Sequence, residues 1–316
     1  MSILITGGTG FLGAHLARAL VKQGKKVILF EANPNLKIIE DIAANVEIVR
    51  GDIANWAEVI DAVSTYKIRE IFHNAALLSE NAEKFYLKAY QVNVTGTWHA
   101  LEAARLFKVE KVLFSSTIGT YGDFVRDPVP NDAPQFPHSM YGATKVAAER
   151  LGEYYYYRFG LDFRGVRFPS VIGPGRGGGG LSAYTTLLVQ LPAAGLPYDI
   201  YVTPETRLAV LYIDDAVNAL ISLSGAENKQ LSRRIYNIGG VLCSAQEMVD
   251  CVKGILPQAE LNFVPDDEMV KILKTVPSFL DDTLARQDWG WNEVFDLQTM
   301  VRSFIAEIQL NSHRYV

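Results

Sequence analysis

Cysteine is scarce in this chain, and the scarcity limits the kinds of site that it can build. Only Cys243 and Cys251 occur among 316 residues, and no second Cys/His pair lies near them. A structural zinc centre needs such a second pair, and a disulfide-stabilised fold needs more cysteines. The two cysteines lie eight residues apart on a segment with a helical pattern. We therefore interpret both as core residues and expect no metal.

Clusters of basic residues and long apolar runs are absent as well. The formal net charge is −5, and the densest basic run, KQGKK at 22–26, fits a solvated turn. Binding to nucleic acid or to an anionic membrane calls for a basic cluster, and a membrane span needs about 20 apolar residues. The N-terminal MSILITGG has no basic leader. These features predict a cytoplasmic protein whose partner is a small molecule, with no nucleic-acid or membrane partner.

What the chain does contain is an alternation of short apolar segments and amphipathic segments. The first half has predicted strands at 2–6, 26–30, 46–52, 70–76 and 111–116, with predicted helices at 15–24, 55–64 and 91–107. Short apolar strands joined by helices indicate a buried parallel sheet with right-handed crossovers. The predicted fold class is α/β, a doubly wound Rossmann sheet whose ligands lie beyond the carboxyl ends of the strands.

The second half of the chain is less regular. A predicted helix and strand precede a glycine-rich stretch, and further segments carry strand or helix patterns: 141–158, 162–168, 210–223, 234–240, 245–256, 260–265 and 297–309. At this length we expect a large domain with a smaller lobe. We predict a dinucleotide-binding Rossmann domain over 1–168, to which 210–240 returns, and a substrate-binding lobe formed by 169–209 and 241–316.

The segment ITGGTGFLGAHLA at 5–17 predicts a nucleotide site. It places Gly7, Gly10 and Gly13 at a turn from a strand into a helix. Small residues there let the backbone approach a pyrophosphate, and the helix N-terminus offers free N–H groups. Glu31 ends the second strand, where a carboxylate can bind the adenosine ribose hydroxyls and repel a 2′-phosphate. Because no arginine follows directly, the pattern favours NAD over NADP.

The segment SMYGATKVAAER at 139–150 predicts a catalytic pair. Tyr141 and Lys145 are four positions apart on a helical segment, and so lie on one face. The ordinary pKa of tyrosine is about 10, and we expect the neighbouring ammonium to lower it by favouring the phenolate. Ser116 and Thr117 end a predicted strand, where a hydroxyl can bond the substrate oxygen. Tyr141 is therefore the predicted base for a proton transfer.

Together, TGGTGFLG, GDI at 51–53, HNAA at 73–76, VNVTGT at 92–97, FSST and YGATK resemble the extended short-chain dehydrogenase/reductase superfamily. The resemblance covers essentially the whole chain and implies a triad of Thr117, Tyr141 and Lys145, with Ser116 beside it. It implies an NAD site formed by Gly7, Gly10, Phe11, Leu12, Gly13, Glu31, Asp52, Ile53, Asn74, Ala75, Ala76, Asn93, Lys145 and Phe168. It also implies a homodimer through the helices at 91–107 and 141–158.

Two reactions stay open within the superfamily. HNAALLSE at 73–80, SSTIGTYG at 115–122, RFP at 167–169 and VPSFLDDTLARQDWGW at 276–291 are similar to the short-chain L-threonine 3-dehydrogenase group. That group implies oxidation of a small, threonine-like secondary alcohol, with Ser79 binding substrate. A sugar or nucleotide-sugar epimerase would use the same tyrosine but retain NADH. Ser170 stands where such epimerases typically carry an asparagine.

The stretch PGRGGGGLSAYTT at 174–186 holds five of the chain's 25 glycines. The threonine enzymes tend to read GTTDY here, where this chain has GLSAY at 180–184. Consecutive glycines have high backbone freedom. We predict a mobile loop that orders over substrate, with Arg176, Ser182 and Tyr184 as substrate-binding residues. A spacer without a catalytic role is the alternative.

Overall fold

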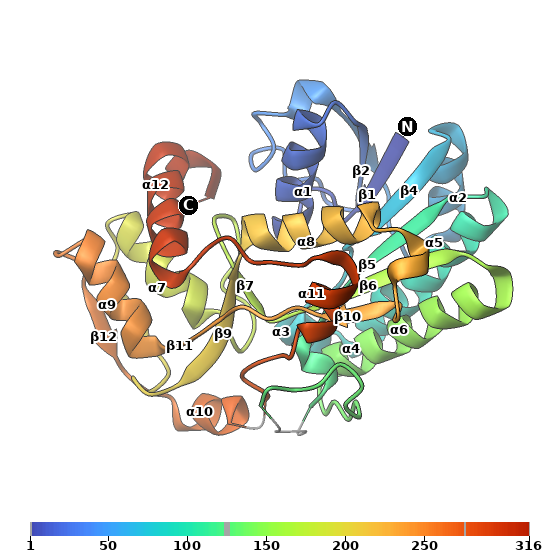
Figure 1. Cartoon of the computed structure of the whole chain (residues 1–316). Helices are drawn as coiled ribbons and strands as arrows, with labels where there is room; N and C mark the ends of the chain where they lie inside the picture. Colours follow the sequence, from blue (N-terminus) through green and yellow to red (C-terminus); the bar gives the residue numbers. More distant parts are fainter. Residues whose placement is uncertain (1, 123–126, 275, 316) are drawn as a thin grey trace.

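Seven parallel strands form the central sheet, in the order β10-β6-β5-β4-β1-β2-β3 (Figure 1). The computed structural model describes residues 2–122, 127–274 and 276–315. The strands are β1 (Ser2–Thr6), β2 (Lys26–Glu31), β3 (Val46–Arg50), β4 (Ile68–His73), β5 (Lys111–Thr117), β6 (Asp162–Phe168) and β10 (Ile235–Asn237). The strand order reverses between β1 and β4, and ligands of such sheets bind outside the carboxyl ends at this point. The predicted doubly wound α/β fold is confirmed.

Helices cover both faces of the sheet. On one face α1 (Phe11–Lys22) packs with α8 (Ile213–Gly225), and on the other α2 (Trp56–Thr65), α5 (Gly96–Leu106) and α6 (Met140–Phe159) lie side by side. Alternate residues of β1 enter the two cores, Ile3 and Ile5 on one face and Leu4 on the other. A strand buried on both faces reads as a continuous apolar run, which is why the sequence marks it.

The remaining elements form a smaller region, at the left of Figure 1. It holds a three-stranded sheet in the order β11-β9-β7 and a pair formed by β8 and β12. Its elements are β7 (Ser170–Ile172), α7 (Tyr184–Ala193), β8 (Tyr198–Ile200), β9 (Arg207–Tyr212), β11 (Val241–Ser244), α9 (Ala245–Ile255), β12 (Leu261–Phe263), α10 (Asp267–Leu273) and α12 (Leu297–Tyr315). α11 (Thr283–Trp289) lies against β10 at the border with the main sheet.

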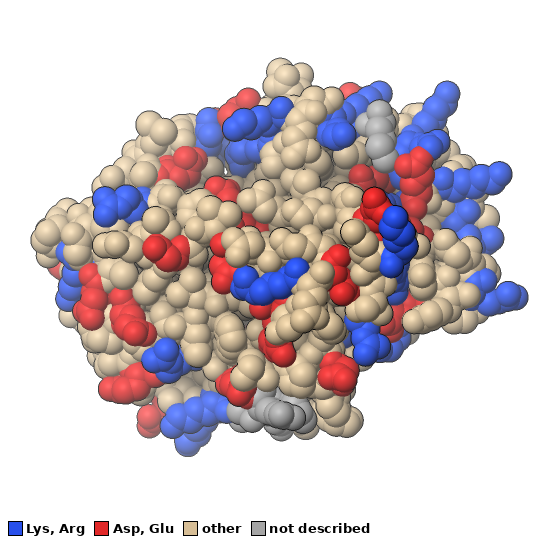
Figure 2. Space-filling view, viewed as in Figure 1, with Lys and Arg blue, Asp and Glu red and all other residues tan. Residues whose placement is uncertain are grey.

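Segment 210–240 is shared between the two regions. Its β10 extends the main sheet beside β6 and its α8 covers one face, whereas its first residues belong to β9 of the small sheet. The exact division into two domains stays a prediction. None of the helices in the described part of the chain combines the length and the apolar character needed to cross a membrane. On the face seen in Figure 2, acidic and basic side chains are interspersed, so neither sign dominates it.

The structure differs from the sequence predictions at several segments. The predicted helix 91–107 begins with a π-helical segment, Tyr90–Thr95, and two unpredicted helices precede it, α3 (Ser79–Lys84) and α4 (Tyr86–Ala89). Helix α7 begins at Tyr184, within the stretch predicted as a loop. Single 3₁₀ turns lie at Ala43–Asn45, Ile118–Thr120 and Asn228–Gln230.

The two cysteines lie on different elements. Cys243 belongs to strand β11 and Cys251 to helix α9, so the helical interpretation of Cys243 was wrong. Alternation of buried and exposed residues over four positions is too short a signal to separate from the helix that follows it. Both thiols are free, and Cys243 is buried among core residues while Cys251 is partly buried beside them. Their interpretation as core residues is confirmed.

Gly152 brings α6 into direct contact with β6. A Cβ at this position would lie 2.1 Å from Cζ of Phe163. We expect Gly152→Ala to lower the free energy of unfolding by about 1–3 kcal/mol, because an extra methyl in a packed core forces its neighbours to move. Gly254→Ala in α9 is the matched control: its Cβ would meet open space, and alanine favours a helix over glycine. Denaturant titration measures both, and equal stability of the two variants would contradict the packing argument.

Candidate cofactor and active site

The turn between β1 and α1 has the shape that a pyrophosphate needs. Gly7 adopts a φ of +67°, which favours glycine, and its N–H donates to the carbonyl of Phe30 at 3.0 Å. A Cβ at Gly13 would lie 2.1 Å from the carbonyl oxygen of Gly7, so glycine is required for α1 to start this close to the turn. Gly10 precedes α1 without a side-chain cap. The first N–H groups of α1 are therefore available to an anion.

The predicted adenosine-binding residues lie at the ends of the neighbouring strands. Glu31 ends β2, and its Oε1 accepts a hydrogen bond from the N–H of Ala32 at 3.1 Å. Asp52 follows β3 and forms an ion pair with Lys88 at 2.7 Å. The side chain of Ile53 is buried against Gly96 instead of facing outward. Glu31 and Asp52 thus place carboxylate oxygens at this edge of the sheet, whereas the side chain of Ile53 packs in the core.

The segment after β4 approaches the glycine turn closely. A Cβ at Gly7 would lie 2.9 Å from the nitrogen of Ala75, and the N–H of Ala75 donates to Oγ1 of Thr6 at 3.2 Å. Asn74 accepts a hydrogen bond from Ser115 at 2.6 Å. The Nδ2 of Asn74 is buried and has no partner within the described residues. A buried amide donor without a partner costs free energy, and a bound dinucleotide at this turn would satisfy it.

The other residues assigned to the cofactor surround this position. Ala76 follows Ala75 and is partly exposed, and Phe11 and Leu12 form the first turn of α1, packed against the core. Phe168 ends β6 and is buried in the same core. These residues frame the site, and their contact with cofactor stays a prediction.

A buried histidine that the triad does not include connects the two central strands. Nδ1 of His73 lies 2.7 Å from Oγ1 of Thr6, and its Nε2 lies 2.9 Å from Oγ1 of Thr97. The hydroxyl of Thr97 donates to the carbonyl of Asn93 at 2.6 Å, so Nε2 carries the proton and Nδ1 accepts one from Thr6. Burial lowers the pKa of His73 to about 3, which keeps the imidazole neutral. His73 is thus a structural link rather than a proton acceptor for substrate.

Asn93, in the π-helical segment, fixes α6 relative to the loop after β4. Its Oδ1 accepts from the N–H of Leu77 at 2.8 Å, and its Nδ2 donates to the carbonyl of Leu77 and to Oγ1 of Thr144. Thr144 lies on α6 between Tyr141 and Lys145, and its hydroxyl donates to the carbonyl of Tyr141 at 2.8 Å. Asn93 thereby positions the helix that carries the predicted base.

Tyr141, Lys145 and Thr117 come together as the sequence predicts. Tyr141 lies in the first turn of α6, which is capped by Ser139, and its phenol hydrogen-bonds Thr117 at the end of β5. Nζ of Lys145 donates to the carbonyl of Ser115 at 2.8 Å and lies 5.8 Å from the centre of the Tyr141 ring. A phenol, a hydroxyl and an ammonium thus meet beyond the carboxyl end of β5, the arrangement that proton abstraction from an alcohol requires.

The pKa of Tyr141, the predicted base, is raised, whereas we expected it to be lowered. Burial raises the pKa of Tyr141 to about 12, and the groups that oppose the rise are the Thr117 hydroxyl and the Arg176 guanidinium, not Lys145. Burial also lowers the pKa of Lys145 to about 7, against the pull of Glu149. The predicted lowering by Lys145 was therefore wrong for the protein alone. Desolvation favours the neutral form of both groups, and the lysine is directed at a backbone carbonyl.

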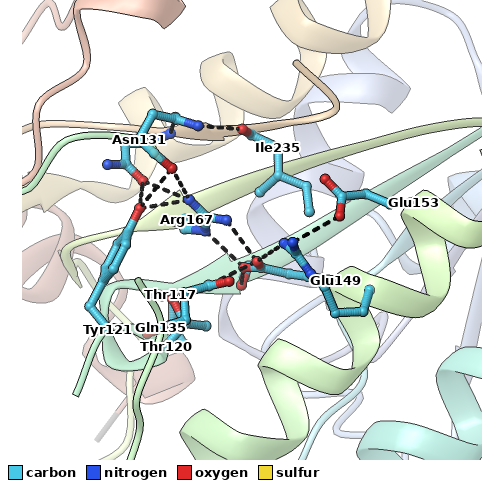
Figure 3. A network of polar contacts seen from close by, with 12 residues as sticks. Thr117, Thr120, Tyr121, Asn131, Gln135, Glu149, Glu153, Arg167 and Ile235 are labelled. Carbon is cyan, nitrogen blue, oxygen red and sulfur yellow. Dashed lines mark hydrogen bonds and ion pairs between the residues drawn. The ribbon is translucent and has the colours of Figure 1, made fainter. Parts of the chain in front are cut away.

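The second candidate hydroxyl, Ser116, is hydrogen-bonded to Glu149, which Figure 3 shows with Arg167 and Gln135 around it. Its Oγ donates to Oε1 of Glu149, a fully buried carboxylate. Arg167 binds the same carboxylate through Nε at 3.0 Å and Nη2 at 2.8 Å, and Gln135 donates to it at 2.9 Å. Of the two hydroxyls at the end of β5, only Thr117 hydrogen-bonds Tyr141. Sequence reasoning missed Glu149, although its position four residues after Lys145 on the same helix face was a usable signal.

The residues assigned to substrate lie around the glycine-rich stretch. Ser79 begins α3, and a Cβ at Gly180 would lie 3.8 Å from its hydroxyl oxygen. Arg176 and Ser182 are joined by a hydrogen bond of 2.8 Å. Tyr184 is only 1% exposed, and its ring packs edge-on against Tyr201 in the core. The structure thus brings Ser79, Arg176 and Ser182 to one loop and turns Tyr184 away into the interior.

Comparison with known proteins gives one family. A model of the NAD dependent epimerase/dehydratase family matches residues 3–239. The mitochondrial L-threonine 3-dehydrogenase of Bos taurus is 34% identical over 307 residues, covering 96% of this chain and 81% of that protein. The solved L-threonine dehydrogenase from Phytophthora infestans has a TM-score of 0.89 at 31% identity, covering 98% and 99% of the two chains. A UDP-glucose 4-epimerase from Thermotoga maritima has a TM-score of 0.87 at 24% identity, over 99% and 100%, which shows the fold alone.

Thr117 gives the site a pH dependence that can be tested. Because its hydroxyl bonds the phenol and lowers the pKa of Tyr141, Thr117→Val should raise that pKa. A phenolate base then forms only at higher pH, so the acid limb of the kcat/KM profile should move upward in pH. Thr65→Val, on an exposed turn of α2, is the control. Superimposable profiles for Thr117→Val and the parent would contradict the role of this hydrogen bond.

Proposed function

Because the chain belongs to the NAD dependent epimerase/dehydratase family, we propose that it oxidises the secondary alcohol of a small, threonine-like substrate and releases NADH. The observation that carries the proposal is the junction of Tyr141, Thr117 and Lys145 beside the Gly7–Gly13 turn. The threonine dehydrogenases among the relatives add to it, since they match nearly the whole chain. The chain is accordingly an enzyme, and its cofactor is NAD.

The residues present fit NAD at several points. The turn from Gly7 to Gly13 would hold the pyrophosphate, and Glu31 the adenosine ribose hydroxyls. The unpartnered Nδ2 of Asn74 would bond the dinucleotide near the middle of the site, and Lys145 the nicotinamide ribose. When bound, the oxidised nicotinamide supplies a hydride acceptor and a positive charge, and this charge favours the phenolate of Tyr141.

The chain's own groups then handle the proton and the orientation of the alcohol. The substrate hydroxyl lies between Thr117 and Tyr141, and its oxygen takes over the Thr117 hydrogen bond that the phenol receives in the protein alone. Tyr141, as phenolate, takes the hydroxyl proton while the carbon-bound hydrogen leaves as hydride with its electron pair. The alcohol becomes a ketone, oxidised by two electrons, and the nicotinamide of NAD would be the acceptor of the hydride and its electron pair. Lys145, near its neutral point because burial lowers its pKa to about 7, can pass a proton onward from Tyr141 to solvent.

An epimerase would use the same residues and retain NADH. The net release of NADH during turnover therefore distinguishes the two functions. Purified protein should be supplied with NAD and L-threonine, other small hydroxy acids or UDP-sugars, with NADH followed by absorbance. We expect net NADH from a small hydroxy acid. Interconversion of UDP-sugars with tightly bound NAD and no net NADH from any alcohol would contradict the dehydrogenase.

If Tyr141 is the base, removing its phenol oxygen should abolish most of the turnover. Tyr141→Phe should lower turnover by about 10²-fold or more, because the proton acceptor is lost, while NAD binding measured by fluorescence is unchanged. Tyr157→Phe is the matched control, since Tyr157 lies on the same helix and is 79% exposed. Turnover retained in Tyr141→Phe would assign the base to another group.

A homodimer is the second part of the proposal. Phe85 and the elements that follow it, helices α4, α5 and α6 and the π-helical segment, carry exposed large apolar side chains: Phe85, Tyr86, Leu87, Tyr90, Trp98, Leu106, Tyr154 and Tyr157. Exposed apolar area of this kind marks association surfaces. A solved relative from a metagenome is described as a monomeric L-threonine 3-dehydrogenase, so the assembly needs its own test.

Leu106→Glu tests the association surface. A charge placed in an apolar interface is costly to bury, so we expect sedimentation velocity to change from dimer to monomer. Leu310→Glu on α12, exposed at a remote position, should leave the dimer intact. A monomeric parent protein at micromolar concentration would refute the dimer. A cytoplasmic location also stays a proposal, testable by fractionation, since the bovine relative is named as mitochondrial.

A further inference from the structure

Arg176, in the glycine-rich loop, is a cation that the mechanism above does not use, and its charge acts on the pKa of Tyr141. Its Nη1 donates to Oγ of Ser170 at 3.1 Å, to the carbonyl of Val171 at 2.8 Å and to Oγ1 of Thr186 at 3.3 Å. Its Nη2 donates to Oγ of Ser182 at 2.8 Å. Four neutral acceptors from β7, α7 and the intervening loop therefore hold the guanidinium in one place.

No carboxylate of the described residues faces this guanidinium. The ionisable groups that act on its pKa are the phenols of Tyr201 and Tyr141. Burial has the larger effect and lowers the pKa of Arg176 to about 10. The group is therefore still protonated near neutral pH. Burying a charge without a counter-ion costs free energy. The buried arginines Arg167, Arg164 and Arg234 differ in this respect: Arg167 pairs with Glu149, and the other two pair with Asp162.

The Nε and Nη2 edge of the Arg176 guanidinium indicates how an anion would bind to it. Nε has no acceptor among the described residues, whereas Nη1 has three and Nη2 has one. The Nε and Nη2 edge of a guanidinium is a two-donor fork that matches the two oxygens of a carboxylate. Arg176 is also only partly buried, as is Tyr141. Both groups therefore keep part of their surface open to a ligand.

The glycines on either side leave room for such a ligand. A side chain at Gly177 would meet nothing within 4 Å, and one at Gly180 would come nearest to the hydroxyl of Ser79. Gly175 and Gly180 have φ values of +89° and +99°, which other residues rarely adopt. The loop therefore uses glycine to bend around one fixed arginine, which bonds Ser182, and its Gly180 lies near the hydroxyl of Ser79.

We propose that Arg176 binds the carboxylate of the substrate, so that the enzyme selects small hydroxy acids over neutral alcohols and nucleotide sugars. The charge of the guanidinium acts on the pKa of Tyr141, which assigns the two groups to one site, and a 2- or 3-hydroxy acid would present its carboxylate to the first and its hydroxyl to the second. The hydroxyl of Ser182, which accepts from Arg176, can donate its own proton to the same carboxylate. The inference rests on the proposed alcohol oxidation and names its substrate class.

The test compares acids with their neutral amides. With L-threonine or 3-hydroxybutyrate, Arg176→Met should raise KM by about 10²-fold, the loss expected for a charge-assisted hydrogen-bond pair, with a smaller change in kcat. With L-threoninamide, Arg176→Met and the parent should have similar kcat/KM. Arg176→Lys should recover part of the loss. Arg302→Met, on an exposed turn of α12, is the matched control and should behave as the parent.

A binding measurement on the parent protein needs neither a variant nor turnover. Calorimetry on the NAD-loaded enzyme should show that butyrate binds and butyramide does not, and that Arg176→Met abolishes the binding of butyrate. Equal KM values in Arg176→Met and the parent, or equal binding of butyrate and butyramide, would overturn the inference. Binding of UDP that depends on Arg176 without binding of butyrate would overturn it too. Binding of butyrate through Arg176 without oxidation of any alcohol would support the carboxylate site and refute the dehydrogenase.

Discussion

The active site depends on one imidazole that has to stay neutral. His73 can accept a proton from Thr6 and donate one to Thr97 only as a neutral ring protonated at Nε2. The bonds then run in one direction: from the N–H of Ala75 through Thr6, His73 and Thr97 to the carbonyl of Asn93. The amide of Asn93 continues to Thr144, whose hydroxyl holds the carbonyl of Tyr141. A protonated His73 would break this chain, and burial prevents it by lowering the pKa.

The chain of hydrogen bonds joins parts of the site that have different tasks. Ala75 lies against the glycine turn where the pyrophosphate is expected, and Tyr141 is the proposed base. Since both are anchored to the same buried ring, cofactor and base keep a fixed separation, which hydride transfer requires. The π-helical segment contributes by placing Asn93 where its side chain reaches Leu77 and Thr144 at once. Such segments often occur at functional sites.

A second network, around Glu149, controls the opposite side of α6. Glu149 raises the pKa of Lys145 against the effect of burial, and it accepts a hydrogen bond from the hydroxyl of Ser116. Arg167 neutralises the carboxylate, so the pair is buried without an excess charge. Thr117, one residue beyond Ser116 on β5, is thereby left to bond the phenol of Tyr141. The choice between two adjacent hydroxyls is thus made by a buried acid on the neighbouring helix.

The sequence reveals those features of the site that are local in the chain. The glycine turn, the Tyr141–Lys145 spacing and the apolar strands are visible because each depends on residues a few positions apart. The partnership of Ser116 with Arg167 and Glu149 depends on the pairing of β5 with β6, where Ser116 lies opposite Arg167, and no spacing rule expresses that register. Tyr184 was predicted to reach substrate because it follows the glycines. The start of α7 at this residue turns its ring into the core.

The two networks also decide where substrate selection can occur. Among the described groups around Tyr141, the side chains of Ser116, Asn93 and Thr144 are committed to partners within the protein, and Lys145 is held by the carbonyl of Ser115. Among the donors left open are Nδ2 of Asn74, at the cofactor turn, and, in the glycine-rich loop, Nε of Arg176 and the hydroxyl of Ser182. The first lies where every member of a dinucleotide-binding fold meets the same ligand. Discrimination between substrates therefore falls to the loop, and the charge of Arg176 makes an anion the property that it can recognise.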